Sequence, residues 1–354
     1  MNVLSVVDIA WQNYDMSRLR VGGAKEIARL AKGREMALTP GVHNIAEYLD
    51  RQVADEGDHE VLGPLLDASG TSGSVVHAGE TLAEWGDPGA PEMLFSATKS
   101  VLSVVAGLAF DDGRLRPQER VLADISLDGL LVGEFESITW EHLLQQTSMW
   151  EGTLWGKSTS IDRQSTREGD EATGGLPGSG WAYNDVRVNV LCLALTELWR
   201  QPLGEVLAER VMQPLGASTS WSWHGYERSF LRTADREIAV VSGGAHWGGG
   251  LFMSARDLAL IGTALARGGH PVLSREWVSR CWTPCAVRPT YGYLWWLNDQ
   301  RTVFPQAPAS GRCARGNGGR HLLWIDPDRE LVIASHWTED IERFIADVSN
   351  QFTV

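Results

Sequence analysis

Apolar residues recur at regular spacing along the first third of the chain. Over residues 23–38 and 42–57 they return every three or four positions, which is typical of helices with one buried face. Residues 73–79 and 80–86 are short runs with β-branched and aromatic side chains, divided by glycine, and this pattern predicts a hairpin. From 96 to 111 the apolar positions, among them Val101, Leu102, Val104, Val105 and Leu108, cover most of a helix surface. The sequence therefore predicts a helix there that is buried on almost all sides.

The rest of the chain is first helical and then mixed. Residues 115–225 keep helical spacing between loops rich in Gly, Ser and Thr, and residues 254–269 predict a further helix. Two β-like runs, 320–327 and 330–337, follow, and a terminal helix is expected from Asp340. This order of elements predicts an α/β (α+β) fold, in which an antiparallel sheet is flanked by helices and a mainly helical lobe is inserted.

The chain length limits how these elements are organised. With 354 residues and no internal repeat, the chain is expected to form a single domain, residues 1–354, with two lobes. Because the predicted strands lie toward both chain ends, the sheet lobe should comprise about 1–95 and 236–354. The helical lobe should then comprise about 96–235.

The charge balance limits the partners. The formal net charge is −14, which argues against a nucleic-acid surface because such a surface needs clustered positive charge. No uncharged run approaches the roughly 18 residues that a membrane span requires. The first residues lack the basic stretch of a secretory signal. We therefore expect a cytoplasmic protein with a small-molecule partner, and the oligomeric state stays open.

Metal and cofactor motifs are not found in the sequence. The four cysteines are too scattered to form a disulfide framework or a metal site, and the nine histidines include no His-Glu-x-x-His motif. No glycine-rich nucleotide loop follows a predicted strand. His246 and His321 are interpreted as structural. The sequence therefore predicts neither a metal nor a cofactor.

Ser96 and Lys99 stand at the start of the predicted buried helix. A helix places residues three apart on one face, so the hydroxyl and the ammonium can meet. A serine hydroxyl is a poor nucleophile until a base accepts its proton, and a lysine in low-dielectric surroundings can act as that base. The alternative interpretation makes Ser96 a helix cap and Lys99 a side chain that extends to solvent.

The Ser-x-x-Lys stretch is one of several blocks that occur in a fixed order. The blocks are FSATKSVLS, ITWEHLLQQTSMWEG, LPGSGWAYNDVRVNVL, GGGLFMSARDLALIG, YGYLWW and GNGGRHLLWIDPDRELVI. Over about residues 75–337 they resemble the serine β-lactamase and penicillin-binding-protein superfamily. The similarity is to its class C β-lactamase-like branch, with esterases, nylon-oligomer hydrolases and D-aminopeptidases. The resemblance implies a β-lactamase/transpeptidase-like fold and an acyl-enzyme on Ser96.

The second motif of that family, Tyr-x-Asn, corresponds to residues 183–185. The resemblance implies that Tyr183 transfers protons together with Ser96 and Lys99, and a phenol of pKa about 10 is drawn toward phenolate by a nearby ammonium. The alternative for Tyr183 is a core aromatic. The chain departs from the motif at Asp185, where the family usually has Asn. A carboxylate there could favour the charged form of Lys99 or bind a substrate amine.

The third family motif, Lys-Thr-Gly or His-x-Gly, is matched best by Gly316, Asn317 and Gly318. The triplet has no Lys or His in its first place, which lowers the expectation of a β-lactamase or a peptidoglycan carboxypeptidase. The resemblance implies an oxyanion hole made by the backbone N–H of Ser96 and one near Gly319, where glycine lets the acyl group approach. The alternative is a tight hairpin entry.

Two tryptophans, Trp181 and Trp247, lie in blocks that the resemblance places around the site. Aromatic side chains there would build an apolar pocket for the acyl group. Core packing is the alternative for both.

These expectations converge on a serine hydrolase that cleaves an ester or amide of a small molecule through an acyl-Ser96 intermediate, with water or another acceptor releasing the acyl group. Within enzymes, the alternatives are a D-amino-acid peptidase or amidase, which would depend on Asp185, and a β-lactamase-type enzyme. Outside enzymes, the alternative is a non-catalytic binding protein on the same scaffold.

Overall fold

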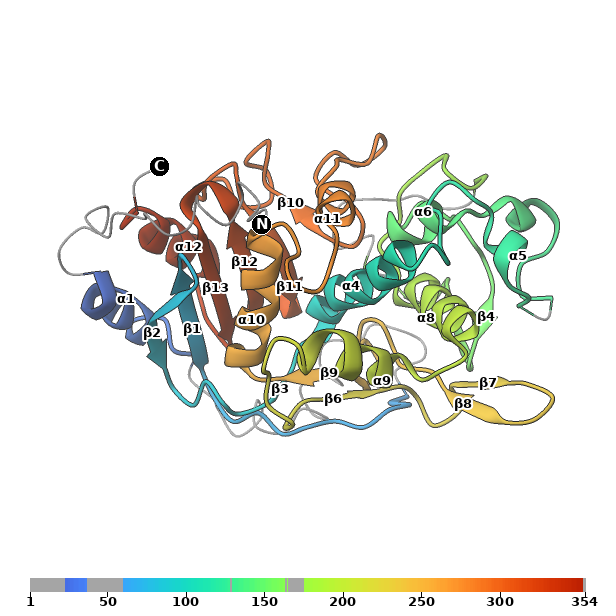
Figure 1. The fold of residues 1–354 in the computed structure, drawn as a ribbon, viewed down its shortest axis with the longest axis horizontal. Coiled ribbons are helices and arrows are strands. Elements are labelled where there is room, and N and C mark those ends of the chain that lie inside the picture. The colour runs from blue at the N-terminus through green and yellow to red at the C-terminus, as the bar shows by residue number, and fades with distance from the viewer. Residues whose placement is uncertain (1–22, 37–59, 128, 163, 165–174, 353–354) are drawn as a thin grey trace, which may run out of the picture.

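The computed structural model describes residues 23–36, 60–127, 129–162, 164 and 175–352. The expected helix over 42–57 lies outside these ranges. Figure 1 shows the sheet and its covering helices toward one end of the molecule and most of the other helices toward the opposite end. In the parts of the chain that are described, none of the helices has the length and apolar character needed to span a membrane.

A six-stranded antiparallel sheet has the order β10-β11-β12-β13-β1-β2 (Figure 1). Its strands are β1 (Ser72–His77), β2 (Glu80–Trp85), β10 (Trp296–Leu297), β11 (Arg312–Gly316), β12 (His321–Asp326) and β13 (Leu331–His336). The pairing of β1 with β13 joins the early and the late strands of the chain in one sheet. Both expected hairpins, β1 with β2 and β12 with β13, are confirmed.

Helices cover both faces of this sheet. They are α1 (Gly23–Lys32), α10 (Ala255–Ala266) and α12 (Ile341–Ser349). A glycine of α10 lies against Val332 of β13. Val332 pairs with Val76 of β1, so these two side chains lie on the face that α10 covers. Trp85 pairs with Gly73, three residues before Val76. Because strand side chains alternate between faces, Trp85 lies on the opposite face. There Trp85 contacts Phe344 of α12 edge to face, and α1 packs beside α12.

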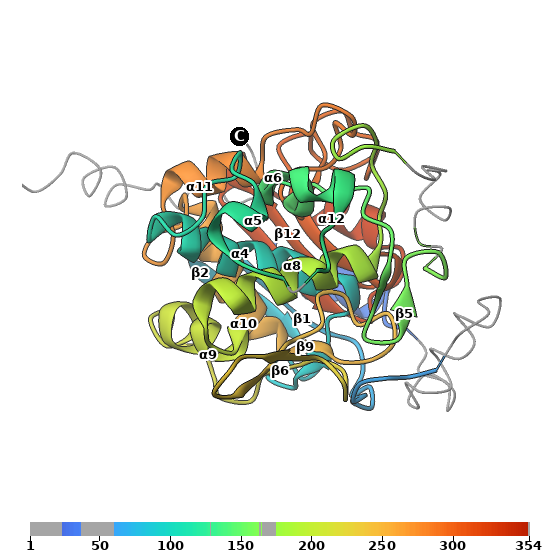
Figure 2. The same cartoon turned by 90° about the vertical axis from the view of Figure 1, so that its right-hand side faces the viewer.

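In the helical part of the molecule, α8, α9 and α11 pack against α4 (Figure 2). The helices of this part are α4 (Thr98–Asp111), α5 (Val121–Asp124), α6 (Trp140–Leu144), α8 (Asp185–Trp199), α9 (Leu203–Leu207) and α11 (Arg275–Cys281). Every residue of α4 from Thr98 to Ala109 is buried, which confirms the helix expected from the apolar run. Such a helix has no solvent face, so its polar side chains must find partners inside the protein.

Short strands complete the fold. A three-stranded sheet contains β3 (Glu92–Met93), β9 (Gly250–Met253) and β6 (Ser222–His224); two small ribbons pair β4 (Thr153–Leu154) with β5 (Lys157–Ser158) and β7 (Phe230–Arg232) with β8 (Glu237–Ala239). The region expected to be mainly helical therefore also holds strands. In addition, α11 packs on α4 although it lies beyond residue 236. We retain one domain with two lobes as our proposal for the organisation.

Candidate active site

Ser96 lies in a single 3-10 turn, η2 (Phe95–Ala97), between β3 and α4. Phe95 has a left-handed backbone, with φ of 50°, and its ring packs against His321 and Trp337. The N-cap residue of α4 is Ala97, not Ser96, and no side chain makes a capping hydrogen bond to that helix. The helix-cap interpretation of Ser96 is therefore wrong, and the residue itself is half-buried.

Lys99 lies one helical turn after Ser96. Its Nζ donates a hydrogen bond to Ser96 Oγ at 2.9 Å. The lysine is 1% exposed, so the interpretation in which it extends to solvent is wrong. A buried ammonium needs a counter-charge, because its desolvation costs several kcal/mol.

Asp185, the first residue of α8, supplies that counter-charge. Its Oδ1 lies 2.5 Å from Lys99 Nζ and also accepts a hydrogen bond from Gln164 Nε2, and its Oδ2 accepts one from the backbone N–H of His246. Burial alone would raise the pKa of Asp185, but the charge of Lys99, together with His246, holds it below the usual value. Both oxygens therefore accept hydrogen bonds from the protein, and the side chain is 1% exposed, so this carboxylate is not presented to a substrate amine.

A second buried carboxylate, Asp162, stands behind the first. Its Oδ2 accepts the backbone N–H of Asp185 at 2.5 Å, and Gln164 donates to it from backbone and side chain. Burial raises the pKa of Asp162, and the neighbouring charge of Asp185 adds to the rise against the effect of His246. The sequence analysis missed Asp162 and Gln164, because both lie in a polar loop that carries no pattern.

Tyr183 presents the face of its ring to Lys99, with Nζ 4.6 Å from the ring centroid. The tyrosine is 4% exposed. Around it, Trp181, Tyr291 and Trp296 make edge-to-face and tilted contacts. The ring is thus held in an aromatic cluster next to the lysine, where a cation over a π face is favourable.

The two expected pocket tryptophans are both inside the protein. Trp181 is 4% exposed and belongs to the aromatic cluster, and Trp247 is 1% exposed. His246 packs edge to face on the Trp247 ring, and the buried Lys157 Nζ lies 5.3 Å from the centroid of that ring. Both side chains are therefore part of the core beside the site residues, which agrees with the core-packing alternative.

The end of β11 approaches the serine turn at Gly316. A Cβ atom on Gly316 would lie 2.1 Å from the carbonyl oxygen of Leu94. Asn317 and Gly318 follow in a left-handed turn, whereas Gly319 lies against Ile341. Of the four expected residues, Gly316 is therefore the one that contacts the turn of Ser96.

A cation also stands at this strand end, one residue before the expected triplet. Arg315 lies on β11 with its guanidinium carbon 3.9 Å from the centroid of the Trp296 ring. The sequence analysis missed it because the triplet was aligned on glycine. The end of β11 therefore carries a positive charge that the motif alignment did not assign to the site.

Replacing Gly316 by alanine is expected to lower stability and activity together. The added methyl group collides with backbone at 2.1 Å, so β11 and η2 must separate, and overpacking of this kind costs about 1–3 kcal/mol. Urea denaturation and ester turnover would measure both effects. Gly204→Ala is the matched control, because its Cβ meets only Trp223 at 4.0 Å. Equal behaviour of the two variants would contradict the close approach.

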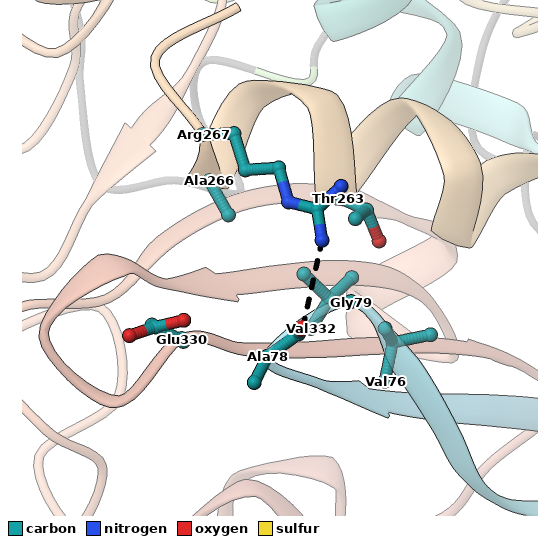
Figure 3. Close-up of a pocket in the computed structure, with 8 residues that line it drawn as sticks. All are labelled: Val76, Ala78, Gly79, Thr263, Ala266, Arg267, Glu330 and Val332. Atoms are coloured by element: carbon teal, nitrogen blue, oxygen red, sulfur yellow. Dashed lines mark hydrogen bonds between the residues drawn. The ribbon is translucent and has the colours of Figure 1, made fainter. Parts of the chain in front are cut away.

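A small hollow elsewhere is not the substrate site (Figure 3). It is lined by Val76, Ala78, Gly79, Thr263, Ala266, Arg267, Glu330 and Val332. Arg267 reaches from α10 toward the carbonyl oxygen of Ala78, at 3.5 Å. The volume is about 10 Å³, enough for one water molecule at most. Among the described residues, no group of three or more His, Cys, Asp or Glu is arranged to hold a metal ion.

Comparisons with known proteins agree with this fold. The fold is similar to that of EstCE1, described as a hydrolase with promiscuous acyltransferase activity, with 14% identity, a TM-score of 0.57, and coverage of 92% of this chain and 98% of that one. A D-stereospecific amidohydrolase from Streptomyces is 16% identical, with a TM-score of 0.55 and coverage of 86% and 97%. A beta-lactamase from Mycobacterium bovis is 17% identical, with a TM-score of 0.54 and coverage of 80% and 95%.

A comparison with curated protein sequences finds no match. The family model described as Beta-lactamase, however, matches residues 60–347, which is well over half of the chain. The order of the motifs, the sheet and the Ser96–Lys99 contact all fall within that range. The chain belongs to the beta-lactamase family.

Proposed function

We propose that the protein is a serine hydrolase that cleaves an ester or amide of a small molecule through an acyl group carried on Ser96. The observation that supports this most is the 2.9 Å contact between Lys99 Nζ and the half-buried Ser96 Oγ. A nucleophile needs both a route to substrate and a base within hydrogen-bond reach, and this pair meets both requirements.

In the proposed reaction Ser96 Oγ attacks the carbonyl carbon, and its proton passes through Lys99 and Tyr183 to the leaving group. The backbone N–H of Ser96 and one from the end of β11, near Gly316, would stabilise the developing oxyanion. Such donors contribute on the order of 3 kcal/mol each. Water or another acceptor then releases the acyl group by the reverse route. No step needs a metal or cofactor.

The placement of Asp185 narrows the substrate class. An amidase that holds a substrate amine on this carboxylate would have to expose it, but the Asp185 side chain is 1% exposed and both of its oxygens accept hydrogen bonds from the protein. The site therefore fits a plain ester or amide better than a D-amino-acid amide. A binding protein without activity would have no use for a buried lysine directed at a half-buried serine.

One observation favours a second candidate, a β-lactamase-type substrate that carries a carboxylate. Arg315 lies immediately before Gly316, and a guanidinium binds a carboxylate through charge-assisted hydrogen bonds. A substrate held at the strand end would have this cation beside it. Arg315 would then act on substrate acids only.

Steady-state kinetics with p-nitrophenyl butyrate, a D-amino-acid p-nitroanilide and a penicillin would separate these candidates. We expect the ester to give the highest kcat/KM. Arg315→Ala should lower turnover of the penicillin about 10- to 100-fold, the worth of a charge-assisted contact, and leave the ester within about twofold. Arg312→Ala on the same strand, which removes a pair with Asp299, is the control. Fastest turnover of the penicillin would establish the second candidate instead.

A further inference from the structure

The residue that departs from the family motif is also the closest partner of the catalytic lysine. Asp185 Oδ1 lies 2.5 Å from Lys99 Nζ, nearer than the 2.9 Å between that nitrogen and Ser96 Oγ. Both side chains of the pair are 1% exposed. Ser96, Lys99 and Asp185 thus form an unbroken line of two hydrogen bonds from a half-buried serine to a buried carboxylate.

The surroundings are built for a carboxylate at this position. Asp185 is the first residue of α8, where the helix dipole favours a negative charge, and Asn184 caps the helix through its own side chain. Gly244 makes room for it, because a Cβ atom there would lie 2.0 Å from Asp185 Oδ2. The backbone N–H of His246 then donates to that oxygen at 3.1 Å.

Lys99 Nζ donates to both Ser96 Oγ and Asp185 Oδ1, so it can take the serine proton only as it passes a proton on. The nearest atom that can accept a proton from it is Asp185 Oδ1. A second carboxylate, Asp162, lies against the backbone of Asp185. Its Oδ2 accepts the backbone N–H of Asp185 and so holds the first turn of α8, and with it Asp185, in place beside Lys99.

We propose that Ser96, Lys99 and Asp185 form a proton relay in which Asp185 takes a proton from Lys99 while Lys99 takes the proton of Ser96. An N–H bond of Lys99 breaks as an O–H bond forms on Asp185 Oδ1. The O–H bond of Ser96 breaks as a new N–H bond forms on Lys99, and Ser96 Oγ bonds to the carbonyl carbon. The carbonyl electron pair moves to its oxygen. As that pair returns and the bond to the leaving group breaks, the proton on Asp185 passes back to Lys99, and a proton moves through Lys99 and Tyr183 to the leaving group.

This relay rests on the proposed function and adds a residue to it. Asp185 acts through Lys99, and Asp162 is a positioning residue that fixes Asp185 and Gln164. The order of nucleophile, central base and buried carboxylate is that of a serine–histidine–aspartate triad with lysine in the central place, but here the carboxylate takes up the proton, which the aspartate of such a triad does not. The ionisable groups that act on Asp185 or Asp162 include Lys99, His246 and Arg187.

The test is Asp185→Asn, an isosteric change that keeps a hydrogen-bond acceptor for Lys99 but removes the proton acceptor. We expect kcat/KM for p-nitrophenyl butyrate to fall about 10²- to 10⁴-fold, the usual worth of general acid–base catalysis. The matched control is Asp257→Asn. Asp257 is also buried near a helix start and accepts a backbone N–H, from Ser218, but it lies outside the relay.

A proton inventory provides a readout that a purely structural role would not change. In mixtures of H₂O and D₂O, kcat/KM of the wild-type protein should give a curved plot, because two protons move in one step. Asp185→Asn should give a straight plot, because only one proton moves.

Two results would overturn the relay alone: a straight plot for the wild type, or an Asp185→Asn variant with kcat/KM within about threefold of wild type. The proton-inventory plot of the wild-type protein tests the relay even if the Asp185→Asn variant does not fold. Absence of ester turnover by a folded wild-type protein would instead overturn the proposed function, and the relay with it.

Discussion

Replacing Ser96 by alanine is expected to lower ester turnover by about 10⁴-fold or more, because the change removes the atom that forms the acyl bond. The Ser96→Ala variant should keep the fold and the thermal stability of the wild-type protein. Ser96 is half-buried and accepts one hydrogen bond, from Lys99, which keeps its ion pair with Asp185 in the variant. Turnover of p-nitrophenyl butyrate and thermal unfolding would measure the two effects.

Ser100→Ala is the matched control for this prediction. Ser100 lies on the same helix, is 2% exposed and donates to the carbonyl oxygen of Leu294 at 2.6 Å. Its removal should cost about 1 kcal/mol of stability, the net worth of one buried hydrogen bond, and leave turnover nearly unchanged. A Ser96→Ala protein that keeps a tenth of the wild-type turnover would show that another residue is the nucleophile.

Acidification below pH 6.5 is expected to destabilise the protein by several kcal/mol through a buried histidine pair. His321 on β12 and His336 on β13 are both 0% exposed, with their Nδ1 atoms 3.2 Å apart. Burial lowers the pKa of His336 from 6.5 to about 3. Burial, with the charge of His336 and Arg320, lowers that of His321 well below 6.5.

The sign follows from where the protons bind. Both pKa values are lower in the folded protein, so between pH 6.5 and about 3 the unfolded chain takes up protons that the folded chain does not. The stabilisation is therefore complete above pH 6.5 and is lost as the pH falls toward 3. Two protons give a limiting slope of about 2.7 kcal/mol per pH unit.

Urea denaturation at pH 7 and pH 5 would measure the loss. Because burial raises the pKa of Glu92 and of Asp162, these groups work in the opposite direction, and the histidine contribution has to be isolated. The double variant His321→Leu/His336→Leu should flatten the dependence, whereas His270→Gln, at an exposed position, should not. Equal stability of the wild type at both pH values would contradict the account.

This histidine pair matters for the site because it lies beneath the serine turn. The ring of His321 packs on Phe95, whose left-handed backbone directly precedes Ser96. Trp337 contacts both rings and donates to Glu92. The turn that presents the nucleophile is thus supported by the central strands of the sheet.

The sequence predicted those features of the site that are local in the chain. The apolar run around Lys99 has no solvent face, so it predicts a helix that must bury its lysine. The 3-10 turn at Ser96 was missed, because a helical repeat cannot distinguish the first helical turn from a preceding tighter one. Its geometry depends on packing by β11 and by the ring of Phe95.

Contacts between distant segments could not be predicted in the same way. Asp185 and Lys99 are 86 positions apart, and nothing in the pattern near Asp162 marks it as a partner of either. The motif alignment selected Gly316 but passed over Arg315, because the end of β11 is set by its pairing with β12 and not by the residues at that end. Pairing register is a property of the folded sheet.

Labelling of the wild-type protein with a fluorophosphonate, followed by intact-protein mass spectrometry and peptide mapping, tests the central claim most directly. The account predicts one adduct per chain, on Ser96, with slower labelling in Lys99→Ala and none in Ser96→Ala. A folded wild-type protein that forms no adduct, or an adduct mapped to another residue, would contradict the proposed acyl-enzyme.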